Sequence, residues 1–162
     1  AEADWRRAQA ISDAGSSIPR QVRTLLAGAN AALQRGEPAL ALQRADAAQQ
    51  RQQELPDGLD ADTRLALAAV CGAAAAAAGD IARGRACFDG PGRALADADD
   101  PRTWSPRWRV HRAEGDVLQA AGERDAAAQH YRTALAILRS RGLQDSNAAQ
   151  ALEETLDAAA AP

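Results

Sequence analysis

The sequence predicts a single all-α domain built from tandem antiparallel helix hairpins. The apolar residues are mostly alanine, with one Phe, one Tyr and three Trp among 162 residues. Such small side chains suit close helix packing better than a sheet, which favours β-branched and aromatic residues. Glycines recur at a fixed spacing, and the helix start and stop signals agree with that spacing. A chain of this length can bury a substantial core as one domain.

The chain repeats with a period of 43 residues. Gly36, Gly79 and Gly122 are spaced at this interval, and an acidic residue follows each. Small residues lie seven positions before and five positions after each glycine. Because glycine adopts the left-handed C′ conformation without a steric penalty, each of the three is expected to end a helix. The acid then lies near the next helix N-terminus, where the dipole stabilises negative charge. By the same pattern, Gly115 is expected to be a close contact between two helices.

The predicted elements follow from the start and stop signals in order. Ser17 and Ser105 each stand just before an early proline, which is typical of a helix start. Asp60 or Asp62 can cap the helix that contains Leu65. Predicted helices span 2–11, 19–35, 38–54, 61–78, 80–89, 106–121, 124–141 and 146–158. Within one domain of 1–162, these form an N-terminal helix and linker (1–17), three repeats (18–55, 60–99 and 105–141) and a capping helix (146–158).

The middle unit is expected to be irregular. The stretch "DGPGR" over 89–93, followed by Pro101, breaks helical continuity because proline removes a backbone donor and its ring clashes with the preceding turn. The segment 90–103 is therefore predicted to be a loop with at most a short helix.

The columns of the repeat resemble the tetratricopeptide repeat, and the third unit matches its signature types best. The commonest form of that repeat has about 34 residues, so this chain is more similar to the longer variety of kinesin light chains and bacterial signalling proteins. The resemblance covers 19–158 and implies three repeats in a right-handed superhelical array. It departs from the pattern at Ala45, where a large aromatic is usual, and at Gly84 and Pro91, where alanine is expected. The matching residues of the third unit are Trp108, Gly115, Leu118, Gly122, Ala127, Tyr131 and Ala134.

The resemblance implies a non-catalytic module that binds a protein or peptide. In bacteria such arrays often follow a serine/threonine kinase domain, so we expect the regulatory or sensor part of a larger signalling protein such as a transmembrane serine/threonine kinase. The first helix of each repeat would line a concave groove. Arginines bind carboxylates bidentately, so a peptide with an apolar middle and an acidic group facing Arg109 and Arg112 is expected. The predicted lining is Arg23, Leu26, Asn30, Leu33, Ala66, Ala69, Ala73, Ala76, Arg109, Arg112, Asp116 and Gln119.

Other interpretations of the same surface stay open. It can be a solvated face, an assembly scaffold that pairs with itself, or the site of a small-ligand sensor or of an unrecognised helical enzyme. No catalytic constellation stands out: His111 and His130 show neither metal-type nor nucleophile-type spacing, so no metal, cofactor or enzymatic activity is expected. The net charge of −3 with interspersed signs argues against nucleic acid. The apolar stretch 65–78 is too short and alanine-rich for membrane insertion.

The two cysteines are a candidate disulfide. Cys71 lies eight residues before Gly79 and Cys87 eight residues after it, so an antiparallel hairpin brings them to the same level. Buried free thiols are the favoured interpretation, because cysteine behaves as a small apolar residue in such interfaces. An oxidising compartment would reverse that preference. The kinase analogy and the facing cysteines together favour a periplasmic over a cytoplasmic location.

Overall fold

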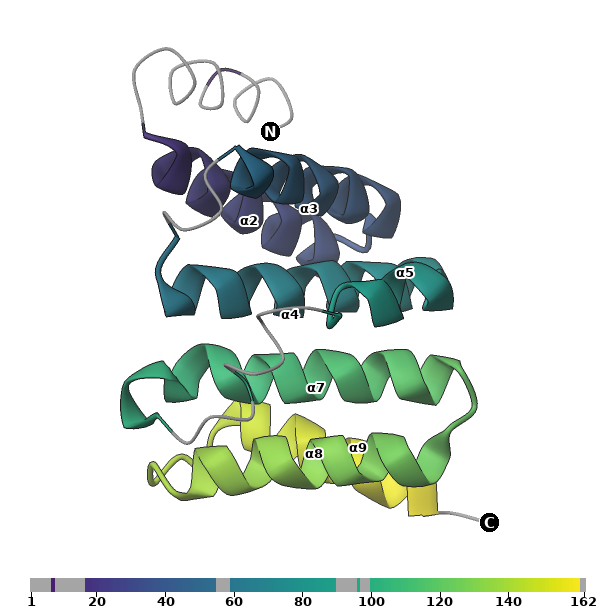
Figure 1. Cartoon of the computed structure of the whole chain (residues 1–162). Coiled ribbons are helices and arrows are strands. Elements are labelled where there is room, and N and C mark those ends of the chain that lie inside the picture. The colour runs from purple at the N-terminus through teal and green to yellow at the C-terminus, as the bar shows by residue number, and fades with distance from the viewer. Residues whose placement is uncertain (1–6, 8–16, 55–58, 90–95, 97–99, 161–162) are drawn as a thin grey trace.

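The computed structural model of the chain is built from helices in the order of the predicted hairpins (Figure 1). It describes residues 7, 17–54, 59–89, 96 and 100–160, and within these ranges there is no strand. Apart from residue 7, the predicted N-terminal helix over 2–11 lies outside the described residues, and so do residues 90–95 and 97–99 of the predicted loop over 90–103. The helices are α2 (Ile18–Gln34), α3 (Pro38–Gln53), α4 (Ala61–Ala78), α5 (Ile81–Ala86), η1 (Pro101–Thr103, a short 3-10 helix), α7 (Trp104–Ala120), α8 (Arg124–Arg139) and α9 (Asn147–Ala160).

The predicted turn glycines end helices in the way the period requires. Gly36, Gly79 and Gly122 have φ angles of 71°, 73° and 81°, which lie in the left-handed region. At Gly36 the backbone N–H of Glu37 donates to the carbonyl of Ala32, which closes the helix end. The equivalent bond forms after Gly79 and Gly122, and a fourth glycine, Gly142, ends α8 in the same way. The prediction of three evenly spaced chain reversals is therefore confirmed.

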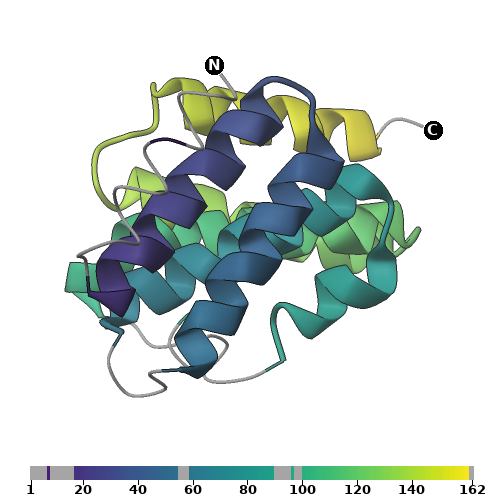
Figure 2. The same cartoon turned by 90° about the horizontal axis from the view of Figure 1, so that it is seen from above.

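Each helix packs against its neighbour in the chain, and the first helices of successive hairpins also pack together. The hairpins are α2–α3, α4–α5 and α7–α8, and α4 contacts both α2 and α7. Figure 1 shows the hairpins following one another from the N-terminal to the C-terminal end, with α9 beside α8. Figure 2, viewed from above, shows α2 and α3 side by side over the other helices. The core therefore runs through the stack in several local clusters.

The small residues of the repeat allow the two helices of a hairpin to approach closely. A Cβ atom on Gly115 would lie 2.5 Å from Cε1 of Tyr131, well inside van der Waals contact. Gly72 has the same relation to the ring of Phe88. The predicted role of Gly115 as a close-contact point is confirmed, and the ring of Tyr131 is what occupies the space.

The second helix of the middle hairpin is shorter than expected. It was predicted over 80–89, but α5 has only six residues and ends at Ala86. After Ala86 the backbone tightens into turns, because the N–H groups of Phe88 and Asp89 donate to the carbonyls of Arg85 and Ala86, three residues back, instead of continuing the α-helical pattern. Asp80 caps the start of α5, because its side chain accepts a hydrogen bond from the backbone N–H of Arg83.

Helix α4 lies in the middle of the stack. By length and composition it could cross a membrane, but 56% of it is buried within this fold, where it contacts α2, α3 and α7. An apolar core helix passes the same test of length and composition. The expectation that the segment does not insert into a membrane stays a prediction.

Candidate functional site

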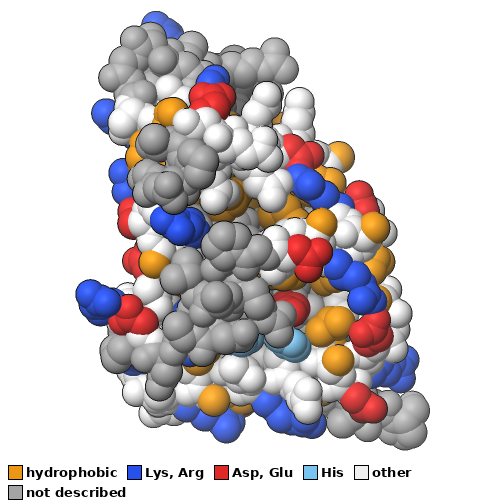
Figure 3. Space-filling model, viewed as in Figure 1, with side chains coloured by type: hydrophobic (Ala, Val, Ile, Leu, Met, Phe, Trp, Pro, Cys, Tyr) orange, Lys and Arg blue, Asp and Glu red, His pale blue; other side chains and the backbone are white. Residues whose placement is uncertain are grey.

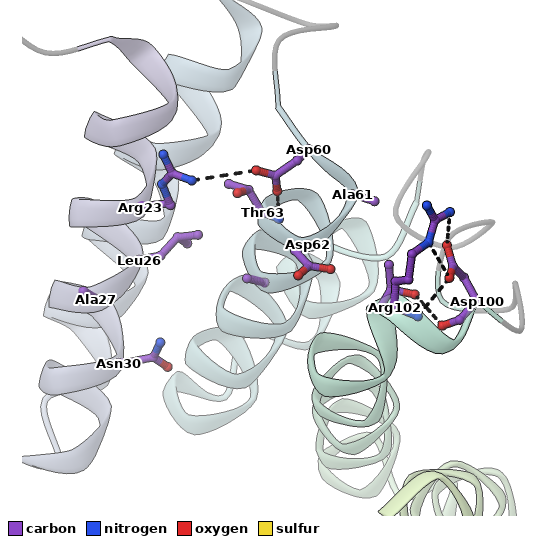
Figure 4. A pocket seen from close by; sticks show the side chains of 12 residues that line it. Arg23, Leu26, Ala27, Asn30, Asp60, Ala61, Asp62, Thr63, Asp100 and Arg102 are labelled. Carbon is purple, nitrogen blue, oxygen red and sulfur yellow. Dashed lines mark hydrogen bonds and ion pairs between the residues drawn. The ribbon is translucent and has the colours of Figure 1, made fainter. Parts of the chain in front are cut away.

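A hollow of about 750 Å³ lies between α2, the N-terminal end of α4 and η1 (Figure 4). Figure 4 shows Arg23, Leu26 and Asn30 on α2 facing the first turns of α4. Its apolar surface comes from α2 and α4, and charged side chains stand around the opening. The lining residues are Arg23, Leu26, Ala27, Asn30, Asp60, Ala61, Asp62, Thr63, Ala66, Asp100, Arg102 and Thr103.

Local structure positions the acidic side chains at this hollow. Asp60 caps α4, because its carboxylate accepts a 2.7 Å hydrogen bond from the backbone N–H of Thr63. Hydrogen bonding from Thr63 lowers the pKa of the Asp60 carboxyl below its ordinary value. Asp100 caps η1 in the same way, and its hydrogen bonds with Arg102 lower the pKa of the Asp100 carboxyl. Both carboxyls are therefore ionised at neutral pH.

Arg23 on α2 is held only loosely. The guanidinium Nη1 of Arg23 lies 3.8 Å from Oδ2 of Asp60, and the two side chains are 60% and 56% exposed. An ion pair this exposed contributes little stability, because water and salt screen it. Arg23 can therefore exchange Asp60 for a ligand carboxylate at small cost, while the neighbouring Asn30 side chain, also exposed, offers both a donor and an acceptor.

The first repeat and the start of the second supply the predicted groove residues that the structure brings together. Arg23, Leu26, Asn30 and Ala66 all line the hollow, as the repeat register predicts. Ala69 does not, since it is 5% exposed and packs in the core cluster between α4 and α7.

Two further predicted lining residues are only partly buried and also pack against the core. Leu33 packs against the cluster of Ala32, Ala41 and Ala74, and Ala73 packs against the cluster that joins α4 and α7. Neither lines the hollow. Apart from Ala66, the alanines of α4 that were predicted to line the groove therefore lie at a helix interface, because α7 packs on that side of α4.

The third repeat does not contribute to the hollow as predicted. Arg109 is exposed, and its guanidinium carbon lies 5.4 Å from the ring centroid of Trp108. Arg112 is also exposed. Neither arginine lines the hollow, where η1 supplies Asp100 and Arg102 instead. Arg109 and Arg112 therefore lie away from this hollow, because the segment before α7 takes the place that the register assigned to α7. That they bind an acidic group stays a prediction.

Asp116 and Gln119 face α8 instead of the hollow. The hydroxyl oxygen of Tyr131 lies 2.9 Å from a carboxylate oxygen of Asp116 and 2.9 Å from the side-chain oxygen of Gln119. Its single hydrogen serves one acceptor at a time. Burial raises the pKa of the Asp116 carboxyl, although the Tyr131 hydrogen bond and the charge of Arg112 act in the opposite direction. These residues brace the third hairpin.

Cys71 and Cys87 form a disulfide, with their Cα atoms 5.8 Å apart. The favoured interpretation as free thiols is wrong for this structure, and the register argument that placed the two cysteines at one level is confirmed. Both cysteines form one buried cluster with Ala45 of α3. A large aromatic at position 45, as the repeat pattern would place, would compete with the disulfide for this space.

The positions eight residues before and eight residues after the turn glycine are joined in every one of the three hairpins. In the first, the Arg44 guanidinium donates a 2.8 Å hydrogen bond to the carbonyl of Gly28, eight residues before Gly36. In the third, His130 and Glu114 stand eight residues on either side of Gly122, and His130 Nδ1 lies 3.3 Å from Glu114 Oε2. Sequence reasoning missed the pair in the third hairpin, although the spacing that matched the cysteines also matches these two residues.

The structure also brings His111 to this pair. His111 Nδ1 lies 3.4 Å from His130 Nδ1. His111, Glu114 and His130 each offer one atom that can ligate a metal ion, and these three atoms lie within 4.8 Å of one another. The linear spacing of the two histidines gave no sign of this cluster, because they come from different helices. The three-residue offset from His111 to Glu114 on one helix face is the signal that could have found it.

Comparison with protein-family models, with curated proteins and with solved structures finds no match to this chain.

Proposed function

We propose that this chain is a non-catalytic interaction module that binds an extended segment of a partner protein in the hollow between α2, α4 and η1. The observation that carries the proposal is the coincidence of two arguments. The repeat register assigned Arg23, Leu26, Asn30 and Ala66 to a groove, and the same residues line a hollow of about 750 Å³. A hollow of this size is in the range of ligand-binding pockets. On this proposal the hairpins form a right-handed array of the tetratricopeptide type.

The chemistry of the hollow defines the segment it would bind. Leu26, Ala27 and Ala66 offer an apolar surface for one aliphatic side chain. Arg23 would bind a carboxylate of the ligand in place of Asp60, and Asn30 would hydrogen-bond its backbone. On the face shown in Figure 3, arginine and acidic side chains are interspersed, which favours a partner that carries charges of both signs.

The disulfide bears on where such a module would work. Disulfides persist in oxidising compartments and are rare in the reducing cytoplasm. The Cys71–Cys87 bridge therefore supports the proposal that the module acts outside the cytoplasm, as the sensing part of a signalling protein that passes the binding event to an attached domain.

Selection from a random peptide library displayed on phage tests this function. Enriched peptides should carry an acidic residue next to an aliphatic one, and their affinity can be measured by fluorescence anisotropy. Arg23→Ala and Asn30→Ala should each weaken binding about tenfold, the effect of losing one charge-assisted or well-placed hydrogen bond. Arg20→Ala is the matched control, since Arg20 is exposed on the same helix but does not line the hollow.

Two results would contradict the proposal. One is a selection that enriches no peptide, and the other is binding that is unchanged by both Arg23→Ala and Asn30→Ala. Sedimentation at several protein concentrations distinguishes the alternative of a self-associating scaffold, which requires a concentration-dependent mass.

A further inference from the structure

The third hairpin contains a cluster of three metal-ligating side chains outside the hollow. His111 and Glu114 lie one helical turn apart on α7, and His130 faces them from α8. The close approach of Gly115 to Tyr131 explains why they meet. Those two residues are the immediate neighbours of Glu114 and His130, so the tightest point of the hairpin also draws this pair together. Figure 3 shows histidine atoms at the molecular surface.

We propose that His111, Glu114 and His130 bind a divalent transition-metal ion, and that zinc is the ion they fit best. Zinc binds imidazole nitrogen at about 2.0–2.1 Å and carboxylate oxygen at about 2.0–2.2 Å in a tetrahedron. Two ligand atoms of such a tetrahedron are separated by about 3.3–3.4 Å, which follows from those bond lengths. Two of the three separations here match this value: 3.4 Å between the two Nδ1 atoms and 3.3 Å from His130 Nδ1 to Glu114 Oε2. All three ligand atoms lie within 4.8 Å of one another, so a small side-chain adjustment would complete the tetrahedral spacing.

The surroundings of the cluster suit a bound cation. His111 is 7% exposed, and the side chains of His130 and Glu114 are 17% and 13% exposed. The Nδ1 atoms of the two imidazoles face each other, so both cannot carry a proton without repulsion. Two neutral imidazoles and a carboxylate can instead supply three lone pairs to one ion. Imidazole ligands select zinc, copper or nickel over magnesium and calcium.

The proposed ion would leave one coordination position for water. Three protein ligands, two of them histidine and one of them glutamate, form an open rather than a closed zinc site. Because the ligands come from α7 and α8, the ion would join the two helices of the third hairpin. Glu114 and His130 occupy the repeat positions at which Cys71 of α4 and Cys87, just after α5, form the disulfide in the second hairpin.

Titration of chelator-treated protein with zinc chloride alone tests the site. Calorimetry should give one ion per chain, and zinc should raise the thermal midpoint of the intact chain, with excess chelator reversing the rise. The cysteines do not compete, since both are in the disulfide. His130→Gln and Glu114→Gln should each weaken zinc binding at least about tenfold. Loss of a group that only supports a ligand already costs that much affinity, and loss of a ligand itself should cost no less.

Glu154→Gln on α9 is the matched control, because Glu154 is exposed and far along the chain from the cluster. Its zinc affinity should equal that of the parent. If a histidine variant fails to fold, cobalt binding by the unaltered chain still decides the question: intense visible absorption supports four-coordinate binding, and the weak absorption of a six-coordinate ion overturns it. No uptake of zinc at micromolar concentration, or equal uptake by His130→Gln and Glu114→Gln, also overturns the proposal and leaves a hydrogen-bonded cluster.

Discussion

At the scale of single residues, pairs of positions change together between repeats. Where the first helix has glycine, at Gly72 and Gly115, the facing segment has a large ring, Phe88 just after α5 or Tyr131 of α8, and the ring occupies the space that a Cβ atom would need. In the first repeat both columns hold alanine, at positions 29 and 45, and both residues are fully buried. In the first repeat, the Cβ of Ala29 therefore fills part of the space that an aromatic ring fills in the other two. Ala45, in the place of that ring, leaves room for the disulfide.

The buried carboxyl of Asp116 should make stability depend on pH. Burial raises its pKa in the folded chain, so the folded state holds this proton to a higher pH than the unfolded chain does. The free energy of unfolding should then fall as pH rises from about 3.9, the ordinary aspartate value, through the raised pKa. Asp116→Asn keeps an acceptor for the Tyr131 hydroxyl and removes the buried charge. We expect it to gain up to about 1 kcal/mol at neutral pH, or about 2–4 °C in Tm.

Thermal unfolding followed by circular dichroism over a range of pH checks this expectation. The gain should disappear at about pH 3, where both states of the parent are protonated. Asp157→Asn, at an exposed position of α9, should show no comparable gain. An Asp116→Asn variant less stable than the parent at neutral pH would show that the Tyr131 and Arg112 interactions outweigh the cost of burial.

At the scale of elements, the middle hairpin differs from the other two because its second helix is short. Helix α5 has six residues, whereas α3 and α8 have sixteen each. A helix of that length is not stable by itself, since nucleation is costly and few hydrogen bonds repay it. The packing of Phe88 beside Gly72 and the bridge between Cys71 and Cys87 hold this end of the hairpin against α4.

Loss of the disulfide should therefore destabilise the chain. The bridged residues are 16 positions apart, and a loop of that length corresponds to about 3 kcal/mol in the chain-entropy account. Chemical denaturation of the parent with and without reductant should show a decrease of about 2–4 kcal/mol in the free energy of unfolding. The double variant Cys71→Ala, Cys87→Ala controls for other effects of the reductant, and its free energy of unfolding should be the same with and without reductant. An unchanged midpoint for the reduced parent would show that the bridge adds no stability.

At the scale of the whole molecule, α9 closes the C-terminal end of the stack. The buried side chains of Ala149 and Leu152 lie in one cluster with Tyr131 and Leu138 of α8. Stacked hairpins bury one face against each neighbour, so the last hairpin needs a capping element. The sequence predicted this capping helix over 146–158, and the structure forms it over Asn147–Ala160.

Truncation of the cap contact should cost as much as a core mutation. Leu152 is 1% exposed, and Leu152→Ala should lower the free energy of unfolding by about 2–5 kcal/mol. Glu154→Ala on the exposed side of the same helix should change it by less than about 0.5 kcal/mol. Urea denaturation of the three proteins measures the difference, and equal midpoints would mean that α9 does not stabilise the third hairpin.

Part of the hollow could be predicted from the sequence, namely the side that α2 forms and Ala66 of α4. Arg23 and Asn30 project from a regular helix whose boundaries are set by an early proline and a turn glycine, so the helical period alone assigns their face. The residues assigned to the groove from the third repeat do not reach the hollow, because the segment before that repeat is irregular. No periodic pattern describes Pro101–Thr103, and these residues bring Asp100 and Arg102 to the hollow in place of Arg109 and Arg112.

The sequence by itself determined where the chain turns and which stretches are helical, because left-handed glycines, caps and prolines act within a few residues of backbone. Only the tertiary structure decided which helix faces close against a neighbour and which stay open. It buried Ala69 under α7, turned Asp116 toward Tyr131 and gathered His111, Glu114 and His130 from two helices. These outcomes depend on how closely helices pack and where irregular segments run, and distances of that kind are not encoded in any local pattern.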